Sequence, residues 1–201
     1  MRHMINCAFS LVLGTPFALP LMAQEMGPKD HLRQMAGCFR VTFNYVEDGV
    51  HDKFYAPVLE KSEIIAEDPL TFRRTLVIEG EEQLHWTDTW TEGEGGMWHQ
   101  KVVGPFDDFR YECEGAFVQN QWTCLAPRAL KPRRDAERPY EYLNRHNTLQ
   151  FNSLRWIHVQ NNEKIAADGS LYSVEVGWNQ YDRRPLEECI VGESASLTKG
   201  A

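Results

Sequence analysis

The feature that most restricts the fold of this chain is a repeated alternation of apolar and polar residues. FRVTFNY at 39–45, TFRRTLVI at 71–78 and FRYECEGAF at 109–117 each place apolar side chains at about every second position. Successive side chains of a β-strand point to opposite faces, so this period predicts strands with one buried and one hydrated face. LYSVEVGW at 171–178 follows the same pattern, and its predicted buried face consists of Tyr172, Val174, Val176 and Trp178.

About nine or ten such strands follow one another, and no long helix lies between them to make a parallel crossover. Turn-rich pieces separate the strands, among them EGEGG at 92–96, QNNEK at 160–164 and AADGS at 166–170. This order predicts an antiparallel up-and-down sheet, which either closes into a barrel or folds into a sandwich. The short helix expected at PKDHLRQMAG, 28–37, can cover one end of a barrel. The prediction is therefore an all-β fold, an antiparallel up-and-down β-barrel of about nine or ten strands with a short N-terminal helix.

The beginning of the chain has the pattern of a secretory signal peptide. A short basic start at Arg2 leads into an uncharged, mostly apolar stretch that ends at the small residue Ala23, before polar QEMGPKD. We therefore expect residues 1–23 to be a signal peptide, with an uncleaved anchor as the alternative, and residues 24–201 to form a single β-barrel domain. The mature protein is then periplasmic or secreted and has no transmembrane segment.

The charge of the chain disfavours a nucleic-acid partner. Its formal net charge is -8 at pH 7, and an acidic protein repels a phosphate backbone. The one basic cluster, KPRRDAER at 131–138, also contains two acidic residues and is interpreted as a solvated loop.

The cysteines that follow residue 23 are even in number, which favours two disulfides in an exported chain: Cys38, Cys113, Cys124 and Cys189. Sequence alone allows three connectivities, and strand geometry chooses among them. A turn at Val118-Gln119 would place Cys113 directly opposite Cys124 on the interior side. Cys38 opens the first strand and Cys189 follows the last, and these two strands are neighbours in a closed barrel. The alternative for Cys113 and Cys124 is a pair of buried free thiols.

The hairpin around EGEGG provides the first group of candidate site residues. With a five-residue loop centred on Glu94, LHWTDTW at 84–90 faces MWHQKVV at 97–103. The other face of this hairpin carries His85 and His99 and suits water. The residues opposed on the predicted interior face are Trp90 with Trp98, Asp88 with Gln100, and Trp86 with Val102.

A second hairpin, NRHNTLQFNSLRWIHVQ at 144–160, provides the rest. A turn at Asn152-Ser153 would oppose Leu149 with Trp156, Asn147 with His158, and Arg145 with Gln160. Polar groups then point the same way as the core residues. A barrel interior with aromatics and a few convergent polar groups is the usual form of a ligand cavity.

Three functions remain open on these residues. The first is a module that binds a small apolar or aromatic ligand through Trp86, Asp88, Trp90, Trp98, Gln100, Arg145, Asn147, Trp156 and His158. The second is a lyase or isomerase that uses Asp88 and His158 as an acid/base pair in the same cavity. The third is a structural envelope protein in which the polar cluster is structural and the core is solid. The histidine spacing gives no metal site, and no cofactor is indicated.

Three segments carry a resemblance to known proteins: RYECEGAFVQNQWTCLAPRALKPRRD, RPYEYLNRHN and WIHVQNNEKI. Together with HWTDTW they resemble an uncharacterised family of exported bacterial proteins, a domain of unknown function, from about MAGCFRVTFNY to VGWNQY. That resemblance implies export and a single domain, and no catalytic residues. LRQMAGCF, a short helix before a first strand, is similar to the start of calycin-type barrels such as lipocalins and CpeT-type chromophore lyases, which implies a calycin-like barrel. The lipocalin G-x-W pattern is replaced here by Gly37-Cys38-Phe39.

Overall fold

A computed structural model describes residues 26–48 and 50–191 and contains one short helix, α1 (Pro28–Arg33), and eleven strands. The predicted signal peptide at residues 1–23 lies outside the described residues. The 3-10 turns are η1 (Glu94–Gly96), η2 (Arg133–Asp135) and η3 (Leu186–Cys189). The strands are β1 (Gly37–Glu47), β2 (Val50–Phe54), β3 (Val58–Glu67), β4 (Leu70–Ile78), β5 (Glu81–Glu92), β6 (Met97–Val103), β7 (Phe109–Val118), β8 (Gln121–Leu130), β9 (Tyr142–Phe151), β10 (Arg155–Ile165) and β11 (Leu171–Arg184).

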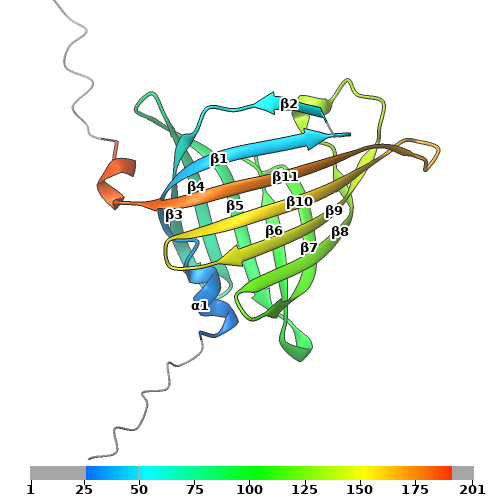
Figure 1. Ribbon diagram of the computed structural model, residues 1–201. Coiled ribbons are helices and arrows are strands. Elements are labelled where there is room, and N and C mark those ends of the chain that lie inside the picture. The colour runs from blue at the N-terminus through cyan, green and yellow to red at the C-terminus, as the bar shows by residue number, and fades with distance from the viewer. Residues whose placement is uncertain (1–25, 49, 192–201) are drawn as a thin grey trace, which may run out of the picture.

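Ten of these strands form a closed antiparallel barrel, because β11 pairs back onto β1 (Figure 1). The order from β3 to β11 is up-and-down, each strand pairing with the next along the chain. The exception is β2, which pairs with the second half of β1 while β3 pairs with the first half. Closure pairs the first strand with the last, and the all-β barrel predicted from the alternation is confirmed.

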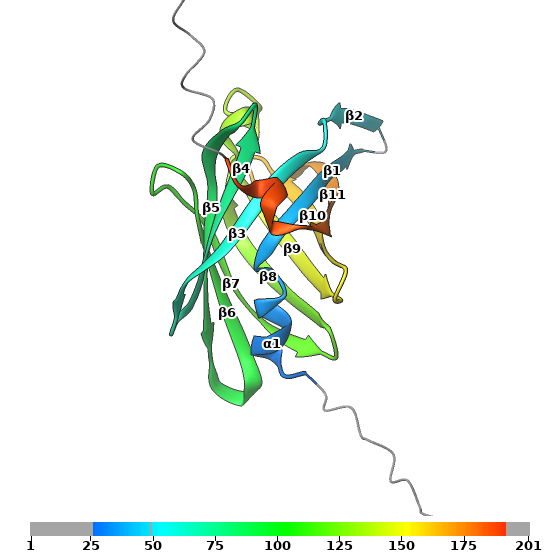
Figure 2. The same ribbon diagram turned by 90° about the vertical axis from the view of Figure 1, so that its left-hand side faces the viewer.

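Helix α1 lies at one end of the barrel and β2 at the other (Figures 1 and 2). Pro28 occupies the first turn of α1, where its missing N–H removes no helical hydrogen bond. Leu32 and Met35 are fully buried and join the apolar core. The helix therefore closes its end of the barrel, as expected from its position before the first strand.

An arginine at the end of β11 holds α1 in place. The Arg183 guanidinium donates hydrogen bonds to the carbonyls of Gln34 at 2.7 Å and Ala36 at 3.0 Å, and it lies 4.9 Å from the ring centre of Phe39. Gly37 makes this approach possible, because a Cβ there would lie 2.6 Å from an Arg183 nitrogen. Its φ of +134° also lies in a region that other residues rarely adopt.

The predicted hairpin registers are wrong by two residues, although the candidate residues keep their predicted face. In β5–β6, Trp90 lies opposite Gln100 and Asp88 opposite Val102. A shift of two residues leaves each side chain on the same face of the sheet, because side chains alternate with a period of two. The remaining corrected pairs are His158 with Leu149, Gln160 with Asn147, Trp156 with Phe151, Arg145 with Asn162, and Cys124 with Gly115.

The turns explain the first two shifts. The N–H of Gly93 donates to the carbonyl of Met97 at 2.8 Å, so the β5–β6 loop is centred on Gly95 instead of Glu94. In β9–β10 the side-chain oxygen of Asn152 accepts the N–H groups of Leu154 and Arg155, each at 2.9 Å. This Asx turn moves the centre of the hairpin one residue further along the chain.

The predicted faces of β11 are reversed. Tyr172, Val176 and Trp178 are exposed on the outer wall, while the residues between them face inward. Glu175 is tolerated inside because Arg134 and Lys164 reach it from other segments, at 3.0 and 3.4 Å. The inward-facing residues of β11 are Ser173, Glu175, Gly177, Asn179 and Tyr181.

QNNEK is not a turn, contrary to the prediction, since β10 runs through it to Ile165. Its residues Gln160, Asn162 and Lys164 point inward and are buried. The barrel therefore has a polar interior on this side.

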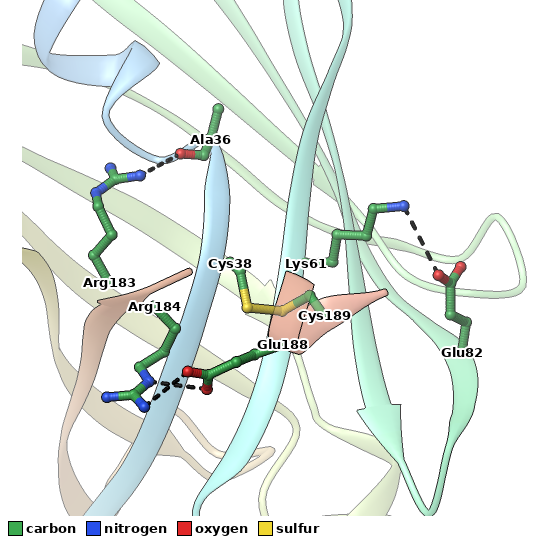
Figure 3. The surroundings of a disulfide bond; sticks show 8 residues. All are labelled: Ala36, Cys38, Lys61, Glu82, Arg183, Arg184, Glu188 and Cys189. Carbon is green, nitrogen blue, oxygen red and sulfur yellow. Dashed lines mark hydrogen bonds and ion pairs between the residues drawn. A yellow bond between two sulfur atoms is a disulfide. The ribbon is translucent and has the colours of Figure 1, made fainter. Parts of the chain in front are cut away.

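The predicted disulfide Cys38–Cys189 is confirmed. Cys38 lies on the outer face of β1, under η3, and its bond to Cys189 ties the segment after β11 to the barrel wall (Figure 3). Beside it Arg184 forms an ion pair with Glu188 at 2.9 Å. The first and last strands are neighbours, as the prediction required.

The second predicted disulfide, Cys113–Cys124, is also confirmed. Both residues face the interior, as predicted, and both are nearly fully buried. Cys124 lies opposite Gly115, so the bond joins positions two residues out of direct opposition. The Cα atoms are 5.9 Å apart, which remains within the usual range.

Candidate functional site

A cavity of about 300 Å³ lies inside the barrel. It extends from Met35, beside α1, to Pro105 and Arg133 in the loops at the other end. Pro105 and Arg133 are exposed, so the cavity opens to solvent at the end opposite the helix. Its aromatic lining comes from five strands: Phe43, Tyr45, Trp86, Tyr111, Trp156 and Tyr181.

A buried arginine on β4 organises one wall of this cavity. Arg74 donates to Glu60 at 2.8 Å, to Asp88 at 3.1 Å and to the hydroxyl of Tyr181 at 2.8 Å. Trp156 and Tyr181 stack with ring centres 3.5 Å apart, and the guanidinium lies 5.1 Å from each ring centre. Each charged group in the cluster therefore has a partner, as buried charges require.

The two carboxylates of this cluster respond differently to burial. Burial raises the pKa of Asp88 above its ordinary value, and Arg74 only partly opposes this effect. For Glu60 burial acts in the same direction, but Arg74 and His85 together lower its pKa. Burial alone would lower the pKa of Arg74, and Glu60 instead raises it well above its ordinary value. Arg74 therefore remains charged and is the cation that Glu60 and Asp88 share.

His85 lies at the cavity, whereas the alternation placed it on the outer, hydrated face. The β4–β5 pairing passes from Arg74–Trp86 to Thr75–Leu84, which leaves His85 as the extra residue of a β-bulge. The bulge turns His85 toward Glu60, and its Nδ1 lies 2.7 Å from the carboxylate. A strict alternation of faces along the sequence does not predict this local change.

His158 belongs to a separate chain of hydrogen bonds. Its Nε2 lies 3.0 Å from the side-chain oxygen of Asn147, and its Nδ1 lies 3.4 Å from the amide nitrogen of Gln160. These partners suit the neutral tautomer with its proton on Nε2. Burial, followed by the charges of Arg145 and Arg74, lowers the pKa of His158 to about 3. The imidazole is therefore uncharged at neutral pH.

Arg145 on β9 is the most weakly partnered charge in the cavity. Its Nε donates to the side-chain oxygen of Asn162 at 3.1 Å, and its guanidinium lies 4.8 Å from the ring centre of Tyr111. Burial lowers the pKa of Arg145 below its ordinary value. Burial also raises the pKa of Tyr111 to about 12, so this phenol is neutral at pH 7, like the amide of Asn162.

The basic cluster at 131–138 was interpreted as a solvated loop, and this is wrong for part of it. Asp135, in η2, is 3 % exposed and lies 3.3 Å from the buried ammonium of Lys164. Arg138 pairs with Glu47 at the end of β1. These ion pairs hold the segment across the open end of the barrel, where Arg134 lines the cavity.

The structure brings six of the nine candidate residues together around the cavity: Trp86, Asp88, Gln100, Arg145, Trp156 and His158. The other three lie away from its surface. Trp90 packs against Trp122 with ring centres 4.7 Å apart, and Trp98 borders a small surface hollow near α1. Asn147 is fully buried behind His158 and supports it by a hydrogen bond.

Sequence reasoning missed the charged centre of the cavity wall. Arg74 stands between Phe72 and Leu76 in the alternation of β4, so the pattern itself places it on the interior face. Glu60 and Asn179 carry no comparable signal, because nothing local distinguishes an inward polar residue from an outward one. The side-chain oxygen of Asn179 is buried, lacks a hydrogen-bond partner and belongs to a residue that lines the cavity.

Among the described residues, no group of three or more His, Cys, Asp or Glu side chains could hold a metal ion. No helix in these ranges is long and apolar enough to cross a membrane. No family model matches the chain, and no curated protein matches it significantly. The resemblance to an uncharacterised exported family therefore gains no support from these comparisons, whereas the closed barrel agrees with the likeness to calycin-type barrels.

Proposed function

We propose that this protein is an exported β-barrel that binds one small molecule with an apolar or aromatic body inside the barrel. The observation that carries the proposal is the cavity of about 300 Å³ with its aromatic lining and its one open end. This volume is at the lower limit for ligand pockets in proteins. At about 30 Å³ for each water molecule of liquid, it suits a ligand of roughly ten to fifteen non-hydrogen atoms.

The polar groups around the cavity differ in their availability to a ligand. Asp88 is committed to Arg74, whereas the side-chain oxygen of Asn179 lacks a partner and Arg145 has only neutral neighbours within hydrogen-bond range. Arg145, Asn179 and the neutral His158 are therefore the groups proposed to orient the polar end of the ligand. Trp86 and Trp156 are proposed to contact its apolar body.

Export is supported by the covalent structure. Two disulfides indicate an oxidising environment, extracellular or periplasmic, since they rarely persist in a reducing cytoplasm. Removal of residues 1–23 as a signal peptide, with 24–201 as the single mature domain, is part of the same proposal. Sequencing the N-terminus of the natively exported protein tests it, and recovery of an uncleaved cytoplasmic chain with free thiols would contradict it.

The two alternative functions have less support. Asp88 is bound to Arg74 and His158 to Asn147 and Gln160, and no hydrogen bond joins Asp88 to His158 within the described ranges. A neutral histidine held in this way lacks the direct acid/base pairing that the lyase or isomerase reading requires. The envelope-protein reading assumes a solid core, and a cavity of about 300 Å³ removes that premise.

A pair of neighbouring substitutions on β11 tests the proposal. Asn179 faces the cavity, and Gln180 faces the opposite side of the sheet. Asn179→Trp should fill much of the cavity, while Gln180→Trp adds the same indole outside it. The probe is the neutral compound naphthalene-2-carboxamide, and calorimetry measures its binding.

Wild type and Gln180→Trp should bind the amide with one site per chain, and Asn179→Trp should bind at least about 10-fold more weakly. Thermal unfolding of each variant reports whether it is folded. Equal binding by both variants would place the probe elsewhere and overturn the proposal. Mass spectrometry of natively purified protein under non-denaturing conditions should in addition detect one bound small molecule.

A further inference from the structure

The charge inside the cavity opposes the charge of the whole chain. The formal net charge of the chain is -8, yet the arginines that line the cavity outnumber the carboxylates. The lining carboxylates are Asp88, Asp108 and Glu175. The lining arginines are Arg74, Arg110, Arg133, Arg134 and Arg145.

Four of these arginines have carboxylate partners. Arg74 pairs with Glu60 and Asp88 on the cavity wall. At the open end, Arg110 and Arg133 lie 3.2 and 3.5 Å from Asp108. Arg134 lies 3.0 Å from Glu175. Each of these guanidinium groups therefore already has a carboxylate partner within the protein.

Arg145 differs from them, because no carboxylate in the described part of the chain lies within 4.0 Å of its guanidinium. Its direct contacts are the amide of Asn162 and the face of Tyr111, both neutral, and the carboxylate of Glu175 acts on it only from beyond ion-pair distance. Arg145 is half-buried, and a guanidinium, which forms up to five hydrogen bonds, is unfavourable away from water without an anion. The neutral His158 on the neighbouring strand supplies no negative charge either.

We infer, building on the proposed function, that the ligand is a small aromatic carboxylate whose anionic group pairs with Arg145 inside the cavity. The planar guanidinium matches a carboxylate with two parallel hydrogen bonds. The aromatic side chains around the cavity receive the ring of the ligand. One unpaired guanidinium matches one negative charge.

A matched pair of probes separates charge from shape. Naphthalene-2-carboxylate and naphthalene-2-carboxamide have the same number of non-hydrogen atoms and the same planar outline, but only the first is an anion. Calorimetry would measure both probes on wild type, Arg145→Gln and Arg155→Gln. Arg155 is the control, because it lies on the adjacent strand β10, is solvent-exposed and pairs with Asp182 on the outer wall.

Wild type should bind the acid about 10- to 100-fold more tightly than the amide, which is the range for a hydrogen-bonded charge. Arg145→Gln should remove this preference by weakening the acid alone. Arg155→Gln should retain it, which excludes a general effect of one lost positive charge. Circular dichroism checks that each variant is folded, and Arg145→Lys, which keeps the charge, should restore part of the preference.

The outcomes distinguish failure of the inferred anion site from failure of the proposed function. If acid and amide bind wild type equally, the cavity binds small molecules but the inferred anion site is wrong. A preference that survives in Arg145→Gln assigns the anion to another group and also overturns the inference. Failure of both probes to bind wild type contradicts the proposed function itself. If Arg145→Gln does not fold, Arg145→Lys takes its place. A weaker preference for the acid in Arg145→Lys than in wild type then supports the inference, and an unchanged preference contradicts it.

Discussion

Replacing Arg74 by methionine tests whether the charged cluster in the cavity wall depends on one guanidinium. Methionine fills a similar volume of the wall without the charge. The substitution leaves the Glu60 and Asp88 carboxylates, 0 % and 1 % exposed, without their shared cation. Glu60 keeps only His85 as a partner, and Asp88 keeps none of its ion pairs.

Removing one partner of a buried ion pair costs about 3–5 kcal/mol. Because His85 still supports Glu60, we expect Arg74→Met to lower the free energy of unfolding at pH 7 by about 4 kcal/mol. For a domain of this size each kcal/mol lowers Tm by about 2–4 °C, so Tm should fall by roughly 8–16 °C. Arg73→Met is the matched control, since Arg73 is exposed on the outer face and should change stability by less than about 0.5 kcal/mol.

The loss of stability in Arg74→Met should depend on pH in a definite direction. Without Arg74 the pKa values of both carboxyls rise in the folded state above their unfolded values. A carboxyl with a raised folded pKa favours folding at low pH and loses that contribution as pH increases through the folded pKa. The deficit of Arg74→Met should therefore shrink between pH 7 and pH 5. Urea unfolding at both values measures it, and a deficit under 1 kcal/mol at pH 7, or one that grows toward pH 5, would refute the reasoning.

Two further predictions concern the disulfides and the buried imidazole. Replacing Cys38 and Cys189 by alanine should lower the free energy of unfolding by about 5 kcal/mol by the loop-entropy relation, because the two residues are 151 positions apart. The same change at Cys113 and Cys124, which are 11 positions apart, should lower it by about 3 kcal/mol. Urea unfolding measures both values, and a larger loss for the shorter loop would contradict this ranking. The folded pKa of His158, about 3, lies below its ordinary value of 6.5, so the unfolded chain binds the extra proton and stability rises with pH over that interval. Between pH 4 and 6, His158→Gln should reduce the slope of the free energy of unfolding against pH by up to about 1.4 kcal/mol per pH unit. If NMR showed that His158 titrates near pH 6.5 in the folded protein, the lowered pKa would be disproved.

The faces of most strands could be predicted from sequence, and their register could not. Trp86, Asp88, Gln100 and Trp156 face inward as the alternation implied, because a shift of two residues leaves every face unchanged. The register depends on where a turn closes, and the Asx turn at Asn152 is set by a side-chain hydrogen bond that counting residues does not reveal. The disulfide prediction succeeded for the same reason, since neighbouring positions on one face remain within reach of each other.

The polar interior was the part that alternation could not predict. In β11 the apolar residues Val176 and Trp178 face outward, and Glu175 faces inward. Burying Glu175 is acceptable only because Arg134 and Lys164 reach it from segments distant in sequence. Local periodicity contains no information on such compensation, so it assigns the buried carboxylate to water.

The most direct measurement for the central claim is a crystal structure of the protein with naphthalene-2-carboxylate. We predict one molecule inside the barrel, its rings against Trp86 and Trp156 and its carboxylate within about 3.2 Å of the Arg145 guanidinium. A barrel interior closed by side chains, or a ligand bound only on the outer wall, would contradict the account.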